Sequence, residues 1–146
     1  MIFDEKPEGF VPDIEVVGCL VEHDGKILLL HRHNNKSQGG KWGIPAGKVD
    51  FRDNNDKKLA MIRELQEETG LNINEKDLIF YKTFFVIYPD KKYFYHYHKV
   101  NIKEKVDIVI ENKEHQAFTW VTLKDALNMS LVGHEDYCLK HAYKIK

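Results

Sequence analysis

The sequence predicts a single domain of the α/β (α+β) class, extending over residues 1–146. Strand-like apolar runs outnumber helical ones, and one long helical stretch lies between two regions that look like hairpins. Hydrophobic residues make up 42% of the chain and charged residues 31%. This balance, at this length, is typical of one globular domain with a packed core and a solvated surface.

The first hairpin is expected near the start of the chain. Two aliphatic runs, 14–21 and 27–30, flank the pair Asp24-Gly25, which is typical of tight turns. Both runs are almost continuously apolar rather than alternating, and this predicts strands that are covered on both faces. Residues 42–50, which a proline and a glycine interrupt, are expected to form a strand edge or a tight turn.

A helix is predicted from Asp56 to Thr69. Its N-cap can be Asn54, Asn55 or Asp56, since these side chains accept hydrogen bonds from free backbone N–H groups. Gly70 follows the last helical residue and can take the left-handed conformation in which many helices end.

The predicted helix has an apolar side and an acidic side. At 100° per residue, the apolar side carries Leu59, Ile62, Leu65 and Thr69. The opposite side carries Glu64, Glu67 and Glu68. Three neighbouring carboxylates repel one another, so the pattern indicates either a solvated acidic surface or a set of ligands for a divalent cation.

The second hairpin is expected in the middle of the chain, where two strand-like runs at 78–88 and 93–102 flank the turn residues 89–92. Aromatic and β-branched residues dominate both runs, as is typical of sheets. The remaining expected elements are strands at 105–110 and 117–121 and helices at 122–129 and 134–144.

Charge and cysteine content exclude several classes of protein. Lys and Arg number 22 and Asp and Glu 23, so no global basic field favours a nucleic acid polymer as partner. Cys19 and Cys138 are far apart and lack metal-binding spacing, which favours a reduced intracellular compartment. No run is long and apolar enough for a signal peptide or a membrane span, so we expect a cytoplasmic protein without membrane contact.

Residues 47–71 resemble the Nudix box, the motif G-x5-E-x7-R-E-U-x-E-E-x-G-U in which U is apolar. The block Arg63–Leu71 matches this motif at every specified position. The wider resemblance includes the lead-in Trp42–Gly47 and a late segment that runs from Glu114-His115 to Trp120. The chain is therefore similar to the Nudix hydrolases over most of its length.

The start of the box departs from the motif in two respects. Ala46 stands where the family usually has a glycine. Sixteen positions separate Gly47 from Arg63, whereas the motif has about fourteen. The early glutamate of the motif consequently falls on Asp53 when counted from Gly47, or on Asn55 when counted back from Arg63.

The resemblance implies a fold, a reaction and a set of functional residues. The fold is an α/β/α sandwich around a mixed β-sheet, and the reaction is hydrolysis of a nucleoside diphosphate linked to another group. The implied cofactor is Mg²⁺ or Mn²⁺, and its implied ligands are Gly47 (through its carbonyl), Glu64, Glu67 and Glu68. The implied catalytic residues are Glu64 or Glu67 as the base and Arg63 as the orienting residue, with Glu114 or His115 as rival bases.

A nucleotide is the expected partner, and its phosphates need cations near the box. Arg32 is the strongest such candidate, because a guanidinium fork matches phosphate geometry. The full set of expected substrate-binding residues is Arg32, Lys48, Glu114 and His115. Tyrosines of the second hairpin either pack in the sheet or stack on a nucleobase. A homodimer remains an open alternative to a monomer.

The first expectation for activity is Mg²⁺-dependent hydrolysis of an acid anhydride in a nucleoside triphosphate, which can be an oxidised one, to a monophosphate and diphosphate. This follows from the similarity of the short chain and the block Arg63–Leu71 to MutT-type enzymes. A sugar nucleotide or a dinucleoside polyphosphate is the alternative substrate. A nucleotide-binding module without turnover is the alternative from a different class.

Overall fold

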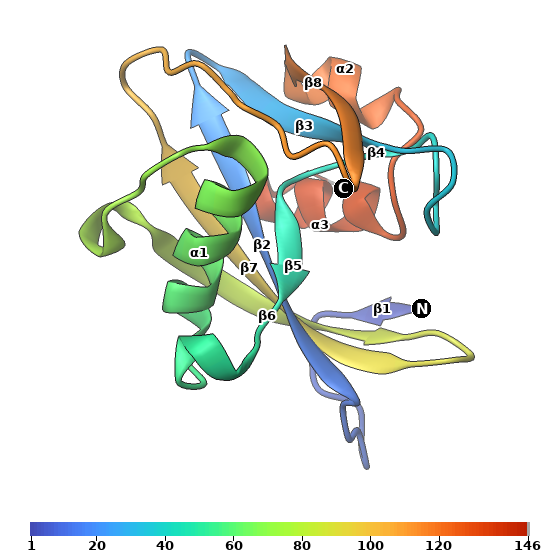
Figure 1. The fold of residues 1–146 in the computed structure, drawn as a ribbon. Coiled ribbons are helices and arrows are strands. Elements are labelled where there is room, and N and C mark those ends of the chain that lie inside the picture. Colours follow the sequence, from blue (N-terminus) through green and yellow to red (C-terminus); the bar gives the residue numbers. More distant parts are fainter. Residues whose placement is uncertain (146) are drawn as a thin grey trace.

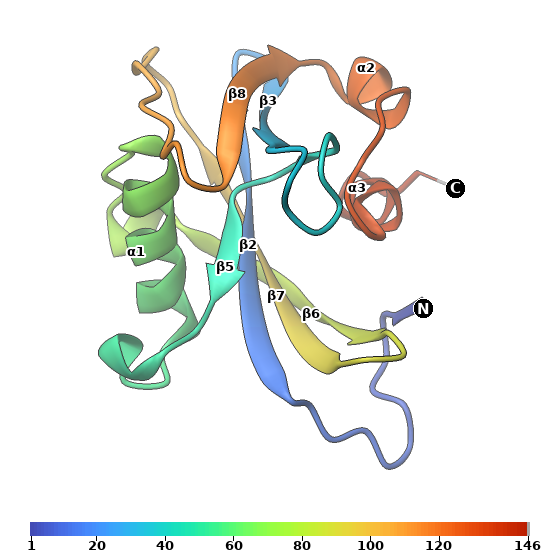
Figure 2. The same cartoon turned by 45° about the vertical axis from the view of Figure 1, so that its right-hand side comes forward.

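Helices lie on both faces of a mixed β-sheet, so the chain folds into three layers (Figures 1 and 2). The computed structural model describes residues 1–145. On one face lies α1 (Lys57–Thr69), and on the other lie α2 (Leu123–Leu127) and α3 (Glu135–Ala142). This arrangement confirms the expected sandwich. None of the helices within residues 1–145 has the length and apolar character needed to cross a membrane.

The sheet is organised around the long strand Ile14–His23, which pairs with three other strands. Its strands are β1 (Ile2–Phe3), β2 (Ile14–His23), β3 (Lys26–Arg32), β4 (Trp42–Gly43), β5 (Ala46–Lys48), β6 (Ile79–Ile87), β7 (Lys92–Asn101) and β8 (His115–Val121). They follow the order β1-β6-β7-β2-β3-β4, with β5 paired to β2 and β8 to β3. The pair β2–β7 is parallel and the other strand pairs are antiparallel. The first part of β2 pairs with β5 and its end with β3, so the sheet forks beside β5.

Both predicted hairpins are confirmed. In the first, Asp24 and Gly25 have φ angles of 51° and 76°, the left-handed pair that a tight two-residue turn between twisted strands requires. The second joins β6 to β7. The predicted strand at 117–121 begins two residues earlier, at His115, and pairs with β3.

The central strands are buried on both faces, as their continuous apolar character predicts. Toward α1 they present Val17, Cys19, Val21, Leu28 and Leu30. Toward α2 and α3 they present Leu20, Ile27 and Leu29. Successive side chains of a strand point to opposite faces, so each run supplies two cores at once.

The predicted bounds of the long helix are confirmed, and its predicted buried face is confirmed at Leu65 and Thr69 but not at Leu59. Asp56 caps the helix by accepting hydrogen bonds from the N–H groups of Lys58 and Leu59, and Gly70 ends it with a φ of 75°. Leu59, however, is 40% exposed. The buried residues are Ala60, Met61, Leu65, Glu68 and Thr69. The helix therefore docks with part of its acidic side against the sheet, which apolar periodicity could not reveal.

The predicted strand at 105–110 is not a strand in the structure. Residues 102–114 form an irregular segment that runs past the end of α1. Val109 N–H donates to the Thr69 carbonyl (2.9 Å), and Glu111 N–H donates to the Glu68 carbonyl (3.3 Å). The segment thus satisfies carbonyls left free at the C-terminal end of α1 and delivers the following residues to β8. The two late helices are each shorter than predicted, since α2 ends at Leu127 and α3 covers 135–142.

Candidate active site

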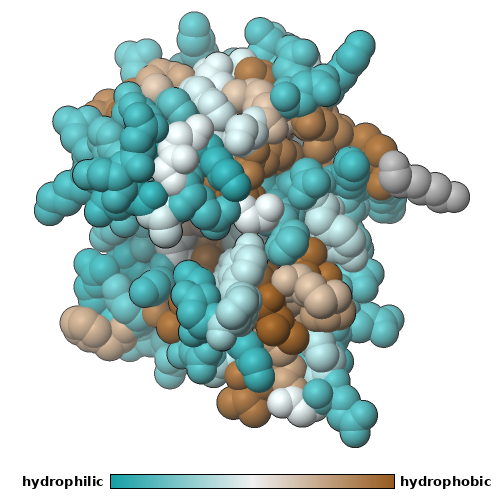
Figure 3. Space-filling model, turned by 90° about the vertical axis from the view of Figure 1, so that its right-hand side faces the viewer, coloured by the Kyte–Doolittle hydropathy of each residue, from teal (hydrophilic) through white to brown (hydrophobic). Residues whose placement is uncertain are grey.

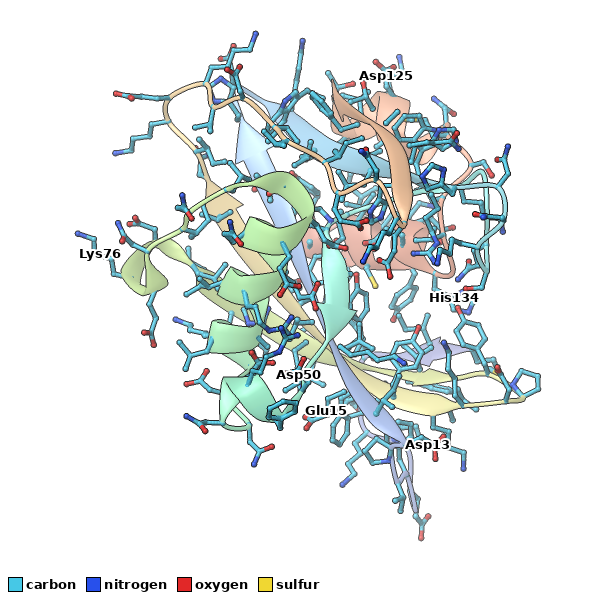
Figure 4. The ribbon with its side chains drawn as sticks, in the orientation of Figure 1. Asp13, Glu15, Asp50, Lys76, Asp125 and His134 are labelled. Carbon is cyan, nitrogen blue, oxygen red and sulfur yellow. The ribbon has the colours of Figure 1, made fainter. Side chains whose placement is uncertain are left out.

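A cleft of about 590 Å³ opens between the α1–β5 side of the molecule and the tyrosine-rich β6–β7 hairpin with α3. Figure 3 shows a hollow near the centre of a largely hydrophilic surface on this side of the molecule. Asp50 and His134 line the cleft from its two sides, the first beside the end of β5 and the second beside α3 (Figure 4). The predicted site residues that line it are Arg32, Gly47, Lys48, Glu64, Glu114 and His115.

Two glutamates of α1 rest directly on the backbone of β5. Glu68 Oε1 accepts a hydrogen bond from Ala46 N–H (2.9 Å). The Glu64 carboxyl group occupies the space that a side chain at position 47 would fill, so a Cβ on Gly47 would overlap with it. Glycine is therefore required at position 47 for close approach of the helix and strand.

Arg63 holds the acidic cluster together. Its Nε and Nη2 donate to the two carboxylate oxygens of Asp53 at 2.8 and 3.0 Å. Its Nη1 donates to Glu64 Oε1 at 3.0 Å and to Glu67 Oε2 at 3.2 Å. Nη2 also donates to the Lys48 carbonyl at 2.9 Å. One guanidinium thus connects the loop, the strand β5 and two helix carboxylates.

Asp53, rather than Asn55, takes the early acidic position of the box. Asp53 is 1% exposed, and its hydrogen bonds from Arg63 hold its pKa below the ordinary value. Asn54 and Asn55 both adopt left-handed φ angles, 51° and 59°. Asparagine tolerates this conformation, so these two residues absorb the extra length of the loop without moving Asp53 away from Arg63.

Glu67 differs from the other two box glutamates. Its side chain is 42% exposed and pairs with Arg63 and, at 3.4 Å, with Arg52. Glu64 and Glu68 are much less exposed, and burial raises the pKa of each. The charge of Glu64 raises the pKa of Glu68 further, whereas Arg63 opposes the shift at Glu64.

The donor set around β5 fits a hard divalent cation. It offers carboxylate oxygens from Glu64 and Glu68 beside a backbone turn that carries no side chain at Gly47. Mg²⁺ prefers such oxygen ligands and leaves positions open for phosphate oxygens. A cation would also relieve the mutual repulsion of these two carboxylates, of which Glu68 is buried, and this is the physical sign that the site fits one.

His115, the first residue of β8, and Glu114, which precedes it, approach the same cluster. A ligand atom of each lies within 4.8 Å of the other and of a Glu68 oxygen. Glu114 is exposed, whereas His115 is 5% exposed and its Nδ1 has no hydrogen-bond partner in the described part of the chain. Burial lowers the pKa of His115, which favours the neutral ring.

The two predicted cations lie at the rim of the cleft. Arg32 Nε donates to the Ser37 carbonyl at 2.9 Å, which sets the direction of the guanidinium. Lys48 is exposed and ends β5. Both line the cleft together with acidic residues, so its lining carries charges of both signs.

The far end of the cleft contains a buried carboxyl group that sequence reasoning missed. Glu135 is 4% exposed and accepts hydrogen bonds from the hydroxyls of Tyr95 (2.9 Å) and Tyr97 (2.8 Å). Burial raises the pKa of Glu135 to about 7. The alternating tyrosines of the second hairpin indicate where this end of the cleft lies. Nothing in the sequence, however, links them to Glu135, the first residue of α3.

Comparison with known proteins agrees with this geometry. The chain matches the family model of the NUDIX domain over residues 12–141. It is 30% identical over 121 residues to the CTP pyrophosphohydrolase of Escherichia coli K12, across 81% of this chain and 82% of that protein.

Two solved structures share the fold. The E. coli ORF135 protein superposes with a TM-score of 0.75 at 26% identity, across 95% of this chain and 94% of that one. The NUDIX domain of Shewanella oneidensis NrtR, solved with ADP ribose, superposes with a TM-score of 0.78 at 19% identity, across 97% and 93%. With the box glutamates, Arg63 and Gly47 in contact as described, the chain belongs to the Nudix family, whose hydrolases use divalent metal ions to cleave pyrophosphate bonds in nucleotide-linked compounds.

Proposed function

We propose that this protein hydrolyses a nucleoside triphosphate to a nucleoside monophosphate and diphosphate. The observation that supports this most is the continuity of one cleft, which contains the box residues Gly47 and Glu64 at one end and Glu135 at the other. The similarity to the E. coli CTP pyrophosphohydrolase over four fifths of both chains favours a triphosphate among the substrates open to the family.

The metal-binding residues in this proposal are Gly47 through its carbonyl, Glu64, Glu67 and Glu68. Glu64 and Glu68 already flank β5, whereas Glu67 would leave its ion pairs with Arg52 and Arg63 to join them. Bound Mg²⁺ or Mn²⁺ would neutralise the carboxylates, attract the phosphates and acidify a water molecule.

Glu64 is the proposed general base. It lines the cleft, and burial raises its pKa toward the range in which a carboxylate accepts a proton effectively. Arg63 donates to Glu64 Oε1, which leaves the other carboxylate oxygen free to receive a proton from the attacking water. Glu67 is the other candidate base in the box, and Glu114 and His115 are rivals from outside it.

In this proposal the phosphates and the nucleobase of the substrate occupy opposite ends of the cleft. Arg32 and Lys48 bind phosphate oxygens from the rim. Tyr88, Tyr93 and Glu135 line the other end, where aromatic faces suit a planar base and a carboxyl group can bind an exocyclic amino group.

A substrate panel tests the proposal. Diphosphate and phosphate release would be measured with canonical and oxidised nucleoside triphosphates, a sugar nucleotide such as ADP ribose, and a dinucleoside polyphosphate, each with and without Mg²⁺. We expect release of diphosphate from one or more triphosphates, abolished by a chelator. Preferential turnover of a sugar nucleotide or a dinucleoside polyphosphate would refute the triphosphate assignment. Thermal stabilisation by nucleotide without any release would support a binding module instead.

Glu64→Gln isolates the catalytic carboxylate. The amide keeps the size of the side chain but cannot accept the proton, so kcat should fall at least about a hundredfold. Glu75→Gln, a change in the short turn after α1, is the matched control and should leave kcat unchanged. Circular dichroism and melting temperature would show that both variants fold. A Glu64→Gln variant with near-normal kcat would remove Glu64 from the role of base.

A further inference from the structure

We infer that Glu68, Glu114 and His115 together bind a divalent transition-metal ion, with an imidazole nitrogen of His115 as one ligand. The inference rests on the proposed function, because it adds a ligand to the metal centre which that function needs. It differs from the box assignment, which consists of oxygen ligands alone.

The geometry allows one ion to contact all three side chains. Their ligand atoms lie within 4.8 Å of one another. An ion equidistant from three such atoms is at most about 2.8 Å from each, so each side chain needs to move by less than about 1 Å to reach bonding distances of about 2.0–2.2 Å. The Glu68 oxygen that Ala46 N–H binds is Oε1, and this leaves Oε2 as a candidate ligand.

His115 carries the second, independent observation. His115 is 5% exposed, yet its Nδ1 has no hydrogen-bond partner among residues 1–145. A buried polar atom without a partner is destabilising, and a bound ion would satisfy it. The strand β8 fixes the residue, since its backbone pairs with Arg32 of β3. The histidines nearby are already engaged, because His33 Nε2 contacts the Asn112 carbonyl at 2.6 Å and His31 stacks on Trp42.

The chemistry of an imidazole determines which ion benefits. Neutral imidazole binds first-row transition ions well and Mg²⁺ poorly, whereas carboxylates serve both. The cluster of Glu68, Glu114 and His115 should therefore bind Mn²⁺, Co²⁺ or Zn²⁺ more tightly than Mg²⁺, and the bond to His115 accounts for the difference in affinity.

Electron spin-echo envelope modulation of the full-length protein with Mn²⁺ tests the inference directly. A directly bound imidazole gives a nitrogen modulation, and uniform ¹⁵N labelling of histidine changes its pattern in the wild-type protein without any substitution. We expect this nitrogen signal in the wild type, its loss in His115→Gln, and its persistence in the matched control His33→Gln. Melting curves would verify that each variant folds.

Isothermal titration gives the second readout. We expect His115→Gln to weaken the binding of Mn²⁺ and Co²⁺ by about tenfold or more, and that of Mg²⁺ by less than about threefold. If His115→Gln fails to fold, the isotope-labelled wild type still shows whether a histidine nitrogen binds the ion, and the absence of that signal would overturn the inference.

Three outcomes would overturn the inference. The first is Mn²⁺ binding without a histidine nitrogen signal in the wild type, and the second is a nitrogen signal that survives in His115→Gln. The third is no Mn²⁺ binding at all. Mg²⁺-dependent hydrolysis and its loss in Glu64→Gln would still hold in the first two cases, so failure of this inference is distinguishable from failure of the proposed function.

Discussion

The contact between Gly47 and Glu64 shows how much a single missing side chain contributes to the site. The Glu64 carboxyl group lies in the space next to the Gly47 α-carbon. This brings a charged group of α1 against the backbone of β5. A larger residue would separate the helix from the strand at the point where the proposed chemistry takes place.

Gly47→Ala should therefore impair activity more than stability. The new methyl group would displace the Glu64 carboxylate by about 1 Å, and such displacements lower kcat by about a hundredfold. Steady-state kinetics and urea unfolding would measure the two effects. Gly25→Ala is the control. Gly25 has a left-handed φ, so an alanine there should lower the free energy of unfolding by about 1 kcal/mol, but its methyl group would lie in open space, away from the site. Equal losses of activity in the two variants would contradict this account.

The loop before α1 and the helix itself act as one unit through the Arg63–Asp53 pair. Asp50 and Asp53 form a capping box on the short turn 51–53, with Asp50 N–H donating to Asp53 Oδ2 at 2.9 Å. Arg63 then binds both oxygens of Asp53. The left-handed residues Asn54 and Asn55 connect this turn to the helix cap at Asp56, so the longer loop still presents its acidic residue to the same arginine.

Arg63→Lys should lower the free energy of unfolding by about 2 to 3 kcal/mol. A lysine ammonium cannot reproduce the bidentate contact with Asp53. The charge of this buried carboxylate would then lose part of the hydrogen bonding that offsets its desolvation. Arg52→Lys is the matched control, since Arg52 is about half exposed and its ion pairs lie at the surface, where solvent screens them. Urea unfolding at neutral pH would measure both, and a loss in Arg63→Lys no larger than the control would argue against this role.

The two cores of the whole molecule contain ionisable groups with opposite effects on stability. On the α1 face, His98 is fully buried, and burial lowers its pKa to about 4. On the α3 face, burial raises the pKa of Glu135 to about 7. Each group is therefore neutral in the folded protein over a range of pH in which it is charged in the unfolded chain.

These two groups should make the pH dependence of stability shallow in the wild type. As pH rises from 4.5 to 7, the unfolded chain ionises Glu135 before the folded protein does, so stability falls. As pH falls from 6.5 to 4, the unfolded chain protonates His98 first, so stability falls in that direction. Between pH 4.5 and 6.5 the two slopes oppose each other.

Glu135→Gln should expose the slope due to His98. The amide can still bond to Tyr95 and Tyr97, whose hydroxyls both donate and accept. Relative to the wild type, the variant should gain about 3 kcal/mol of stability between pH 4.5 and 7. Urea unfolding at half-unit pH intervals would measure this, with exposed Asp136→Asn as the control. Parallel curves for wild type and Glu135→Gln would show that Glu135 titrates normally.

Local sequence determined the hairpins, the bounds of α1 and the chemistry of the box. Asp24-Gly25, Asp56 and Gly70 each encode a backbone conformation through their own side chains, or through the lack of one, so they could be located without a structure. The spacing of Arg63, Glu64, Glu67 and Glu68 likewise follows from helical geometry alone.

Only the tertiary structure decided which of these side chains are buried and which residues from distant segments join them. It turned Leu59 outward and Glu68 inward, chose Asp53 over Asn55, and placed His115 and Glu135 at the cluster and the cleft. The physical reason is that burial and long-range pairing depend on how helix and strands dock. Docking is set by the whole core, and no short stretch of the chain contains that information.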